Sequence, residues 1–247
     1  MTTESPMLKC LSYIDSQLSA AKKAPLASRR QWEHPVVTLS RQTGSGALPI
    51  AEKLAVYLQA HDPTASCPWT VFDKNLFEQV LEDHHLPKRL AQFMPEDRVS
   101  QMEDFMAELL GLRPSTWTLI HQTTETVLRL ADLGHVILVG RGAPVIIRKL
   151  PQAFHVRLVG SLERRIARVQ EYRPIEAKEA AEFVRKTDEG RIRYLKTHFH
   201  RNIDDPLLYH IIINTDEVSL DEAARLIGET VIARIRAGLG ESAATNP

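Results

Sequence analysis

A turn of two glycines and a serine, Gly44-Ser45-Gly46, joins a short β-branched run to a helical pattern. The run Val36–Ser40 is typical of a buried strand, and apolar residues recur at four-residue spacing through 50–58. Glycines allow backbone N–H groups to approach an anion, and the first turn of a helix adds partial positive charge. Strand, turn and helix together therefore predict a phosphate-binding site.

The turn departs from the complete phosphate-binding loop, which reads G-x-x-x-x-G-K-[ST]. Ala47 and Leu48 follow Gly46, so both the lysine that contacts the β- and γ-phosphates and the hydroxyl that binds the metal are absent. Arg41, just after the strand, is the only nearby cation that could replace the lysine. Without that lysine, the glycine turn taken alone fits an ordinary tight turn equally well.

Cations and glycines recur where further strands are expected to end, although lysine plus arginine equals aspartate plus glutamate at 31 each. An arginine between two glycines, as at Gly140-Arg141-Gly142, is poorly placed for packing but suited to a bidentate phosphate contact. Arg165 and Arg168 are three residues apart and share a helical face. Ligands of open α/β sheets bind at the carboxyl ends of the strands, so these groups predict a polyphosphate site.

The elements that must position these side chains alternate between short apolar runs and helical patterns. We expect a three-layer α/β sandwich with a mainly parallel, five-stranded sheet. Ser161 is expected to cap the helix that follows it. The expected strands are Val36–Ser40, Trp69–Asp73, Gly134–Gly140, Phe154–Val159 and Tyr209–Asn214, and the expected helices are 50–58, several within 74–131 including 116–130, then 162–170, 176–198 and 219–237.

Composition excludes several classes of protein. The balanced charge predicts no binding to nucleic acid or to membrane surfaces, and no apolar stretch approaches membrane-spanning length. Cys10 and Cys67 form no metal-type pair, and the histidine pairs lack matching ligands, so no metal ligands are assigned. We expect a cytoplasmic protein with one domain over 34–240. Residues 1–33 are expected to form a helix and a linker, with the helix as a possible homodimer contact.

Five motifs in order resemble the cytidylate kinase-like family, a branch of the P-loop nucleoside monophosphate kinases. The resemblance spans about residues 34–235. It is carried by Ser40-Arg-Gln-Thr-Gly-Ser-Gly46, Phe72-Asp-Lys74, Val139-Gly-Arg-Gly-Ala143, Ser161-Leu-Glu-Arg-Arg165 and Asp205-Pro-Leu-Leu-Tyr209 with Ile213-Asn-Thr215.

The resemblance implies a P-loop kinase-like fold with a helical insert at 74–131 for the acceptor nucleotide and a lid at 161–200. It implies transfer of the ATP γ-phosphoryl group to CMP or dCMP with Mg²⁺. By position, Gly44, Ser45 and Gly46 would bind the donor phosphates, and Asp73 and Arg141 would face the acceptor. The lid would contribute Arg165, Arg168, Asp188 and Arg191.

Two departures leave alternatives open. Cytidylate kinases carry the P-loop lysine, where this chain has Ala47, and an acidic residue before the Gly-Arg pair, where this chain has Val139. The first hypothesis is an ATP-dependent nucleoside monophosphate kinase. The second is a non-catalytic protein that binds or senses nucleotides, and the third is a scaffold assembled through its N-terminal helix.

Overall fold

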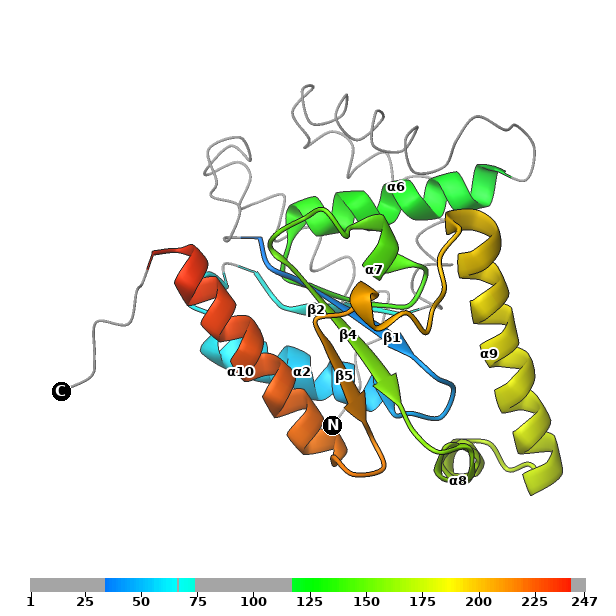
Figure 1. Ribbon diagram of the computed structural model, residues 1–247. Coiled ribbons are helices and arrows are strands. Elements are labelled where there is room, and N and C mark those ends of the chain that lie inside the picture. The colour runs from blue at the N-terminus through cyan, green and yellow to red at the C-terminus, as the bar shows by residue number, and fades with distance from the viewer. Residues whose placement is uncertain (1–33, 66, 74–116, 241–247) are drawn as a thin grey trace.

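A single parallel sheet forms the centre of the protein (Figure 1). The computed structural model describes residues 34–65, 67–73 and 117–240. Every strand pair in the described sheet is parallel, in the order β2-β3-β1-β4-β5. The strands are β1 (Val36–Arg41), β2 (Thr70–Phe72), β3 (Val136–Val139), β4 (Ala153–Val159) and β5 (Ile211–Asn214). The α/β class and the five-stranded sheet predicted from the sequence are confirmed.

Helices cover both faces of this sheet, because side chains alternate between the two faces along each strand. Val37 and Leu39 face α2 (Ala47–His61) and α10 (Leu220–Gly238). Val36 and Leu138 face the opposite core, which α6 (Trp117–Leu133), α7 (Ala143–Ile146) and the end of α9 (Ala177–Phe199) complete. Figure 1 shows the resulting layers.

The two helices on the first face lie very close together. A Cβ atom at Gly228 of α10 would lie 2.3 Å from Cδ1 of Tyr57 on α2, so only glycine admits the tyrosine ring at this distance. Lys53 of α2 also pairs with Asp221 of α10 at 2.6 Å. The contact between Tyr57 and Gly228 thus allows the close spacing of α2 and α10.

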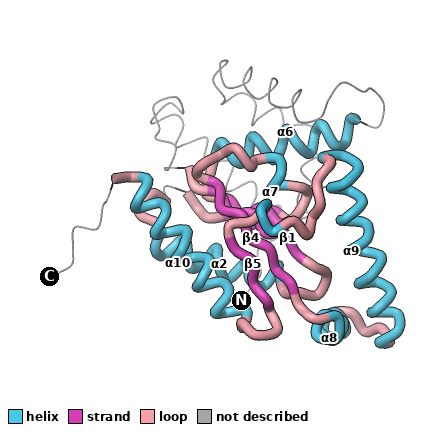
Figure 2. Tube along the Cα trace, viewed as in Figure 1, coloured by secondary structure: helices cyan, strands magenta, loops and turns pink. Residues whose placement is uncertain are grey.

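Beyond the carboxyl ends of β1 and β4, α8 (Leu162–Tyr172) and α9 form a helical pair (Figure 2). Val169, Ala180 and Val184 make a small core between them. Ser161 caps α8 by accepting a hydrogen bond from the Arg164 amide, as predicted. The region expected to form a lid is thus a helical pair in the structure, and its role as a lid stays a prediction.

Strands β1 and β3 lie side by side but lead to helices on opposite faces of the sheet. Strand β1 continues through the glycine turn into α2, whereas β3 continues through Gly140–Gly142 into α7. Such a reversal leaves a crevice beyond the carboxyl ends of the two strands, where ligands bind in open α/β sheets.

Several predicted bounds need correction. The strand expected over Gly134–Gly140 is limited to Val136–Val139, because Gly134, His135 and Gly140 have positive φ angles of 75°, 54° and 89° that no strand accommodates. Asp73 and Tyr209 lie outside strands β2 and β5.

Other predictions concern residues outside the described ranges. Residues 1–33 and most of the insert expected over 74–131 lie outside the described residues, so the predicted homodimer contact does too. The described end of the insert is α6, which continues to Leu133. Within the described ranges, no helix is long and apolar enough to cross a membrane.

A buried histidine in β4 makes the stability of this core sensitive to acid. The His155 side chain is 3% exposed, and its Nδ1 atom lies 2.9 Å from the Thr38 hydroxyl. Burial lowers the pKa of His155 from 6.5 to about 3, with smaller contributions from His210, Arg234 and Arg148. His155 is therefore neutral in the folded protein at neutral pH.

We predict that the free energy of unfolding falls as the pH drops below 6.5. Between that pH and about 3, the unfolded chain binds a proton at His155 that the folded chain excludes. The contribution of His155 is complete above pH 6.5 and declines by up to about 1.4 kcal/mol per pH unit below it. Urea unfolding of the native chain and of His155→Gln, from pH 7 to 5, should show a shallower decline in the variant. The exposed His61→Gln is the control, and equal slopes for His155→Gln and the native chain would contradict the prediction.

Candidate functional site

A cavity of about 280 Å³ lies at the carboxyl ends of β1 and β3. Ser40 and Arg41 of β1 line it beside the turn that follows β3. Residues 187–195 of α9 form one wall, and Tyr209 lies on another. The cavity lies in the crevice that is expected where β1 and β3 lead to helices on opposite faces of the sheet.

Three predicted site residues, Arg41, Arg141 and Arg191, converge in this cavity. Burial is the main cause that lowers the pKa of Arg41 to about 9, and repulsion from Arg191 and Arg141 adds to it. Burial also lowers the pKa of Arg191. A bound anion would stabilise buried arginines that repel one another, so the cavity favours an anionic ligand.

Arg141 is held in the cavity by an unusual turn. Gly140, Arg141 and Gly142 have consecutive positive φ angles of 89°, 53° and 73°. A Cβ atom at Gly140 would lie 1.8 Å from an Nη atom of Arg41, and one at Gly142 would lie 2.9 Å from the Phe199 ring. A left-handed conformation costs a non-glycine residue about 1–2 kcal/mol, and this cost falls on the one residue of the turn that carries a charged side chain.

The absence of a side chain at Gly140 leaves room for the Arg41 guanidinium. The sequence suggested Arg41 as a replacement for the missing P-loop lysine. In the structure its guanidinium crosses to the end of β3 and lines the cavity with Arg141. Ala47, at the lysine position, is the first residue of α2 and is buried in the core.

The glycine turn leads directly into α2. Gly46 is the N-cap, with a φ angle of 78° and no side-chain cap, and the first turn of α2 contains no acidic residue. Ser45 is buried, and its hydroxyl donates to the Gln42 carbonyl at 2.8 Å. Ala47 and Leu48 present N–H groups without a partner within the helix, whereas Pro49 has no N–H group, so this end of α2 offers two helical amides to an anion.

Packing and the positive φ angles together, however, already favour glycine at both positions. A Cβ atom at Gly44 would lie 2.2 Å from the Arg165 carbonyl oxygen, and one at Gly46 would lie 2.5 Å from a methyl carbon of Leu220. Both residues also have positive φ angles. A side chain at Gly46 would therefore disturb the fold whether or not a phosphate binds there. The phosphate contacts of Gly44, Ser45 and Gly46 stay predictions.

Arg165 and Arg168, predicted as lid arginines, are bonded to protein atoms. Arg165 is 8% exposed and donates to the carbonyl oxygens of Gly160 at 3.0 Å and Thr43 at 3.1 Å. Arg168 donates to the Thr215 hydroxyl at 2.8 Å, which places it beside the end of β5, away from the cavity. These contacts hold α8 against the glycine turn and against the loop after β5.

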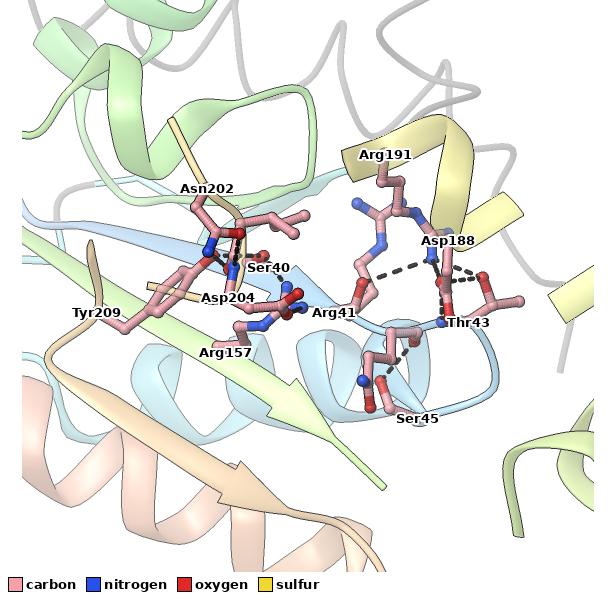
Figure 3. Close-up of polar contacts among 12 residues, drawn as sticks. Ser40, Arg41, Thr43, Ser45, Arg157, Asp188, Arg191, Asn202, Asp204 and Tyr209 are labelled. Carbon is pink, nitrogen blue, oxygen red and sulfur yellow. Dashed lines mark hydrogen bonds and ion pairs between the residues drawn. The ribbon is translucent and has the colours of Figure 1, made fainter. Parts of the chain in front are cut away.

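Asp188 of α9 binds Thr43, the residue before the glycine turn (Figure 3). Its Oδ1 atom accepts hydrogen bonds from the Thr43 amide at 2.8 Å and the Thr43 hydroxyl at 2.7 Å. Arg191 donates to the same oxygen at 2.9 Å, and Arg165 donates to Oδ2 at 2.7 Å. Asp73, by contrast, follows β2 and does not line the cavity. Its negative charge opposes the lowering of the Arg41 pKa but is outweighed by burial and by the neighbouring arginines.

A second polar network, which the sequence did not reveal, supports the cavity wall (Figure 3). Arg157 of β4 donates to the Ser40 hydroxyl at 2.9 Å and to Asp204 at 2.6 Å. The Tyr209 hydroxyl lies 3.2 Å from Ser40 Oγ and 2.7 Å from the Ile203 carbonyl oxygen. The sequence does contain a signal for this network. Arg157 interrupts the apolar strand predicted over Phe154–Val159, and a buried arginine needs polar partners. Thr43 was also missed, although it lies within the glycine-turn motif.

We predict that Arg141→Gly is more stable than Arg141→Ala, although both remove the guanidinium. Glycine adopts the φ angle of 53° freely, whereas alanine keeps the left-handed cost, so the glycine variant should exceed the alanine variant by about 1 kcal/mol. Urea denaturation measures this difference, and calorimetry with inorganic phosphate should show the same loss of affinity in both variants. Equal stability of the two variants would show that Arg141 leaves the left-handed conformation in solution.

One solved structure has a fold similar to that of this chain. A crystal structure described as an uncharacterized protein from Eubacterium ventriosum ATCC 27560 is similar, with a TM-score of 0.62 and 19% sequence identity, covering 81% of this chain and 99% of that one. This likeness shows the fold. A shikimate kinase from Bacteroides thetaiotaomicron gives a TM-score of 0.41 at 15% identity, covering 83% of this chain and 98% of its own. The search of curated proteins found no match.

A family model matches residues 36–217, from the first residue of β1 to the loop after β5. The matched range contains the glycine turn, the Gly-Arg-Gly turn and the whole helical pair α8–α9. It also contains the three arginines of the cavity. The match extends over well over half of the chain, and the protein belongs to the cytidylate kinase-like family.

Proposed function

We propose that the protein is an ATP-dependent phosphotransferase that moves the γ-phosphoryl group of ATP to a nucleoside monophosphate. The observation that carries this proposal is the convergence of Arg41, Arg141 and Arg191 in one cavity beside the glycine turn. Planar guanidinium groups bind phosphate oxygens in pairs, and Tyr194 and Tyr209 offer aromatic surface for the rest of the acceptor. The name of the family supports a cytidine nucleotide, CMP or dCMP, as the acceptor.

On the donor side, the ATP phosphates would lie at the first turn of α2, where unpaired N–H groups and the absence of acidic residues favour an anion. The acceptor phosphate would lie in the arginine cavity. Phosphoryl transfer depends mainly on positioning and on charge stabilisation, and the three arginines would supply both. They would hold the acceptor phosphate and balance charge as the phosphoryl group moves.

Magnesium is the expected companion of ATP, and its chemistry is to bridge and neutralise the donor phosphates. The described ranges contain no cluster of three or more carboxylate, histidine or cysteine side chains. This fits an ion that arrives with ATP, because Mg²⁺ in such sites keeps several waters and takes only one or two carboxylates besides the phosphates. The chain would then bind the phosphates and position them.

A second function, nucleotide binding without transfer, is favoured by the position of Ala47. No lysine contacts the donor phosphates from this position, and Arg41 points to the acceptor cavity instead. The loss of one preorganised donor costs about 2.7–4 kcal/mol of transition-state stabilisation. A protein with this site would still bind nucleotides while transferring phosphate slowly or not at all.

An assay that couples ADP formation to absorbance, run with ATP and Mg²⁺ across nucleoside and deoxynucleoside monophosphates, separates these functions. We expect turnover with CMP and dCMP above that with the other acceptors. Calorimetric binding of ATP and CMP without turnover would establish the second function. Failure to bind any nucleotide would refute both.

The role of Arg141 is tested by two substitutions in the same assay. Arg141→Ala should lower kcat/KM for the acceptor about a hundredfold, because a desolvated charge-assisted hydrogen bond contributes about 1.5–3 kcal/mol. Arg141→Lys keeps the charge but loses the bidentate geometry, so the acceptor KM should still rise. The KM for ATP should stay close to the native value, and equal losses for ATP and acceptor would contradict an acceptor role.

A further inference from the structure

Gly190 lies inside α9, a helix that continues unbroken over 23 residues (Figure 1). In a helix interior, glycine is less favourable than every residue except proline, because its backbone loses the most conformational freedom. Glycine is the better residue there only where the backbone leaves the helical conformation or where something approaches too closely for a Cβ atom. The backbone is helical at Gly190, which leaves a close approach as the physical reason for glycine.

No described protein atom makes this approach. At Gly44, Gly140 and Gly228, a Cβ atom would lie only 2.2, 1.8 and 2.3 Å from a protein atom. At Gly190, apart from its chain neighbours and the helix backbone around it, the part of the chain that the structure describes places no heavy atom within 4 Å of the Cβ position. Packing within these residues therefore does not account for this glycine.

The space beside Gly190 belongs to the arginine cavity. Thr187, Gly190, Arg191 and Tyr194 of α9 all line this cavity. Residues three and four apart lie on the same face of a helix, so Thr187 and Tyr194 flank Gly190 on the preceding and following turns. The glycine therefore forms a recess in the wall between two larger side chains, which we call the Gly190 recess.

The Tyr194 side of the Gly190 recess is fixed by aromatic packing. The centroid of the Tyr194 ring lies 5.2 Å from that of His198 and 5.7 Å from that of Phe199. Phe199 is buried and also packs against the turn after β3, where a Cβ atom at Gly142 would lie 2.9 Å from its ring. Because the tyrosine is held in this way, a side chain added at position 190 would take its space from a ligand and not from the wall.

The surface that the recess offers is apolar. Inside a helix, the amide and carbonyl groups are bonded to residues four positions away, so Gly190 presents Cα hydrogens and no free donor for a phosphate oxygen. It directly precedes Arg191, one of the three arginines proposed to hold the acceptor phosphate. In a nucleotide, the sugar is joined to that phosphate, is uncharged and presents C–H groups. A sugar ring thus has the position and the chemistry that the recess accepts.

We propose that Gly190 is a specificity-determining residue that admits the sugar of the acceptor nucleotide against the backbone of α9. The arginines hold the phosphate, and the sugar lies in the recess between Thr187 and Tyr194. The inference rests on the proposed function, because it concerns the acceptor of that reaction. It adds a contact with the nucleoside to the charged contacts with the phosphate.

The test is the substitution Gly190→Ala, whose two effects have opposite signs. Alanine favours the helix and meets no described protein atom, so Tm should rise by about 2–4 °C. The added methyl group occupies the space of the sugar, so calorimetry should show CMP binding weakened about tenfold, equivalent to about 1.4 kcal/mol. The affinity for inorganic phosphate, which has no sugar, should change less than about twofold, because the arginines are unaltered.

Two further variants separate the bulk of the side chain from the stiffness of the helix. Gly190→Leu should keep most of the gain in Tm, since leucine and alanine have similar helix propensities, but its larger side chain should weaken CMP binding more than alanine does. Thr197→Ala stabilises the same helix at an exposed position that does not line the cavity, and it should leave the affinity for CMP unchanged.

Unchanged CMP affinity in Gly190→Ala and Gly190→Leu would overturn the proposal, and so would a lower Tm or equal losses for CMP and inorganic phosphate. A loss of CMP affinity in Thr197→Ala equal to that in Gly190→Ala would also overturn it, because stiffness and not space would then govern binding.

These measurements involve no phosphoryl transfer, so their outcome is separate from that of the kinase assay. If the native chain phosphorylates CMP and Gly190→Ala binds CMP normally, the kinase function stands and this inference fails. If the native chain binds CMP without turnover and Gly190→Ala loses that binding, the inference stands and the kinase function fails. A native chain that binds no nucleoside monophosphate would refute both.

Discussion

The charge balance around the end of β1 is the constraint on which the rest of the site depends. Arg157, Arg165 and Arg191 reach this end of the sheet from β4, α8 and α9, and each is partly or wholly removed from water. A desolvated guanidinium needs hydrogen-bond acceptors and a compensating charge. Asp204 supplies these for Arg157, and Asp188 supplies them for Arg165 and Arg191. The two carboxylates thereby decide where the helical pair and the segment before β5 lie.

The arginine cavity differs from these ion pairs, because it brings Arg41 and Arg141 beside Arg191. Arg157 and Arg165 have protein partners that fix their positions, and both hold elements together. Arg41 instead is destabilised by its arginine neighbours, and Arg141 has a strained backbone. Strain and repulsion of this kind persist only where the surrounding fold enforces them, and they concentrate at ligand sites. An anion in the cavity would offset the repulsion between these arginines.

Local patterns were enough to predict the fold, because each strand and helix has its own signal in the sequence. The apolar runs, the Ser161 cap and the Gly-Arg-Gly turn all depend on neighbours within a few residues. The contacts that build the site do not. Thr43 and Asp188 are 145 residues apart, and Ser40 and Arg157 are 117 apart, so no spacing rule links them. The Arg41 guanidinium lies against Gly140, which becomes its neighbour only when β3 pairs with β1.

The close approach of Tyr57 and Gly228 has a consequence for how the family varies. Leu220 at the start of α10 fills the space beside Gly46, so the distance between α2 and α10 positions the first turn of α2. A larger residue at 228 would push the helices apart unless the residue at 57 became smaller at the same time. We therefore expect the sizes of the residues at positions 57 and 228 to covary among homologues. The geometry of the glycine turn would then restrict which residues the distant contact between α2 and α10 can accept.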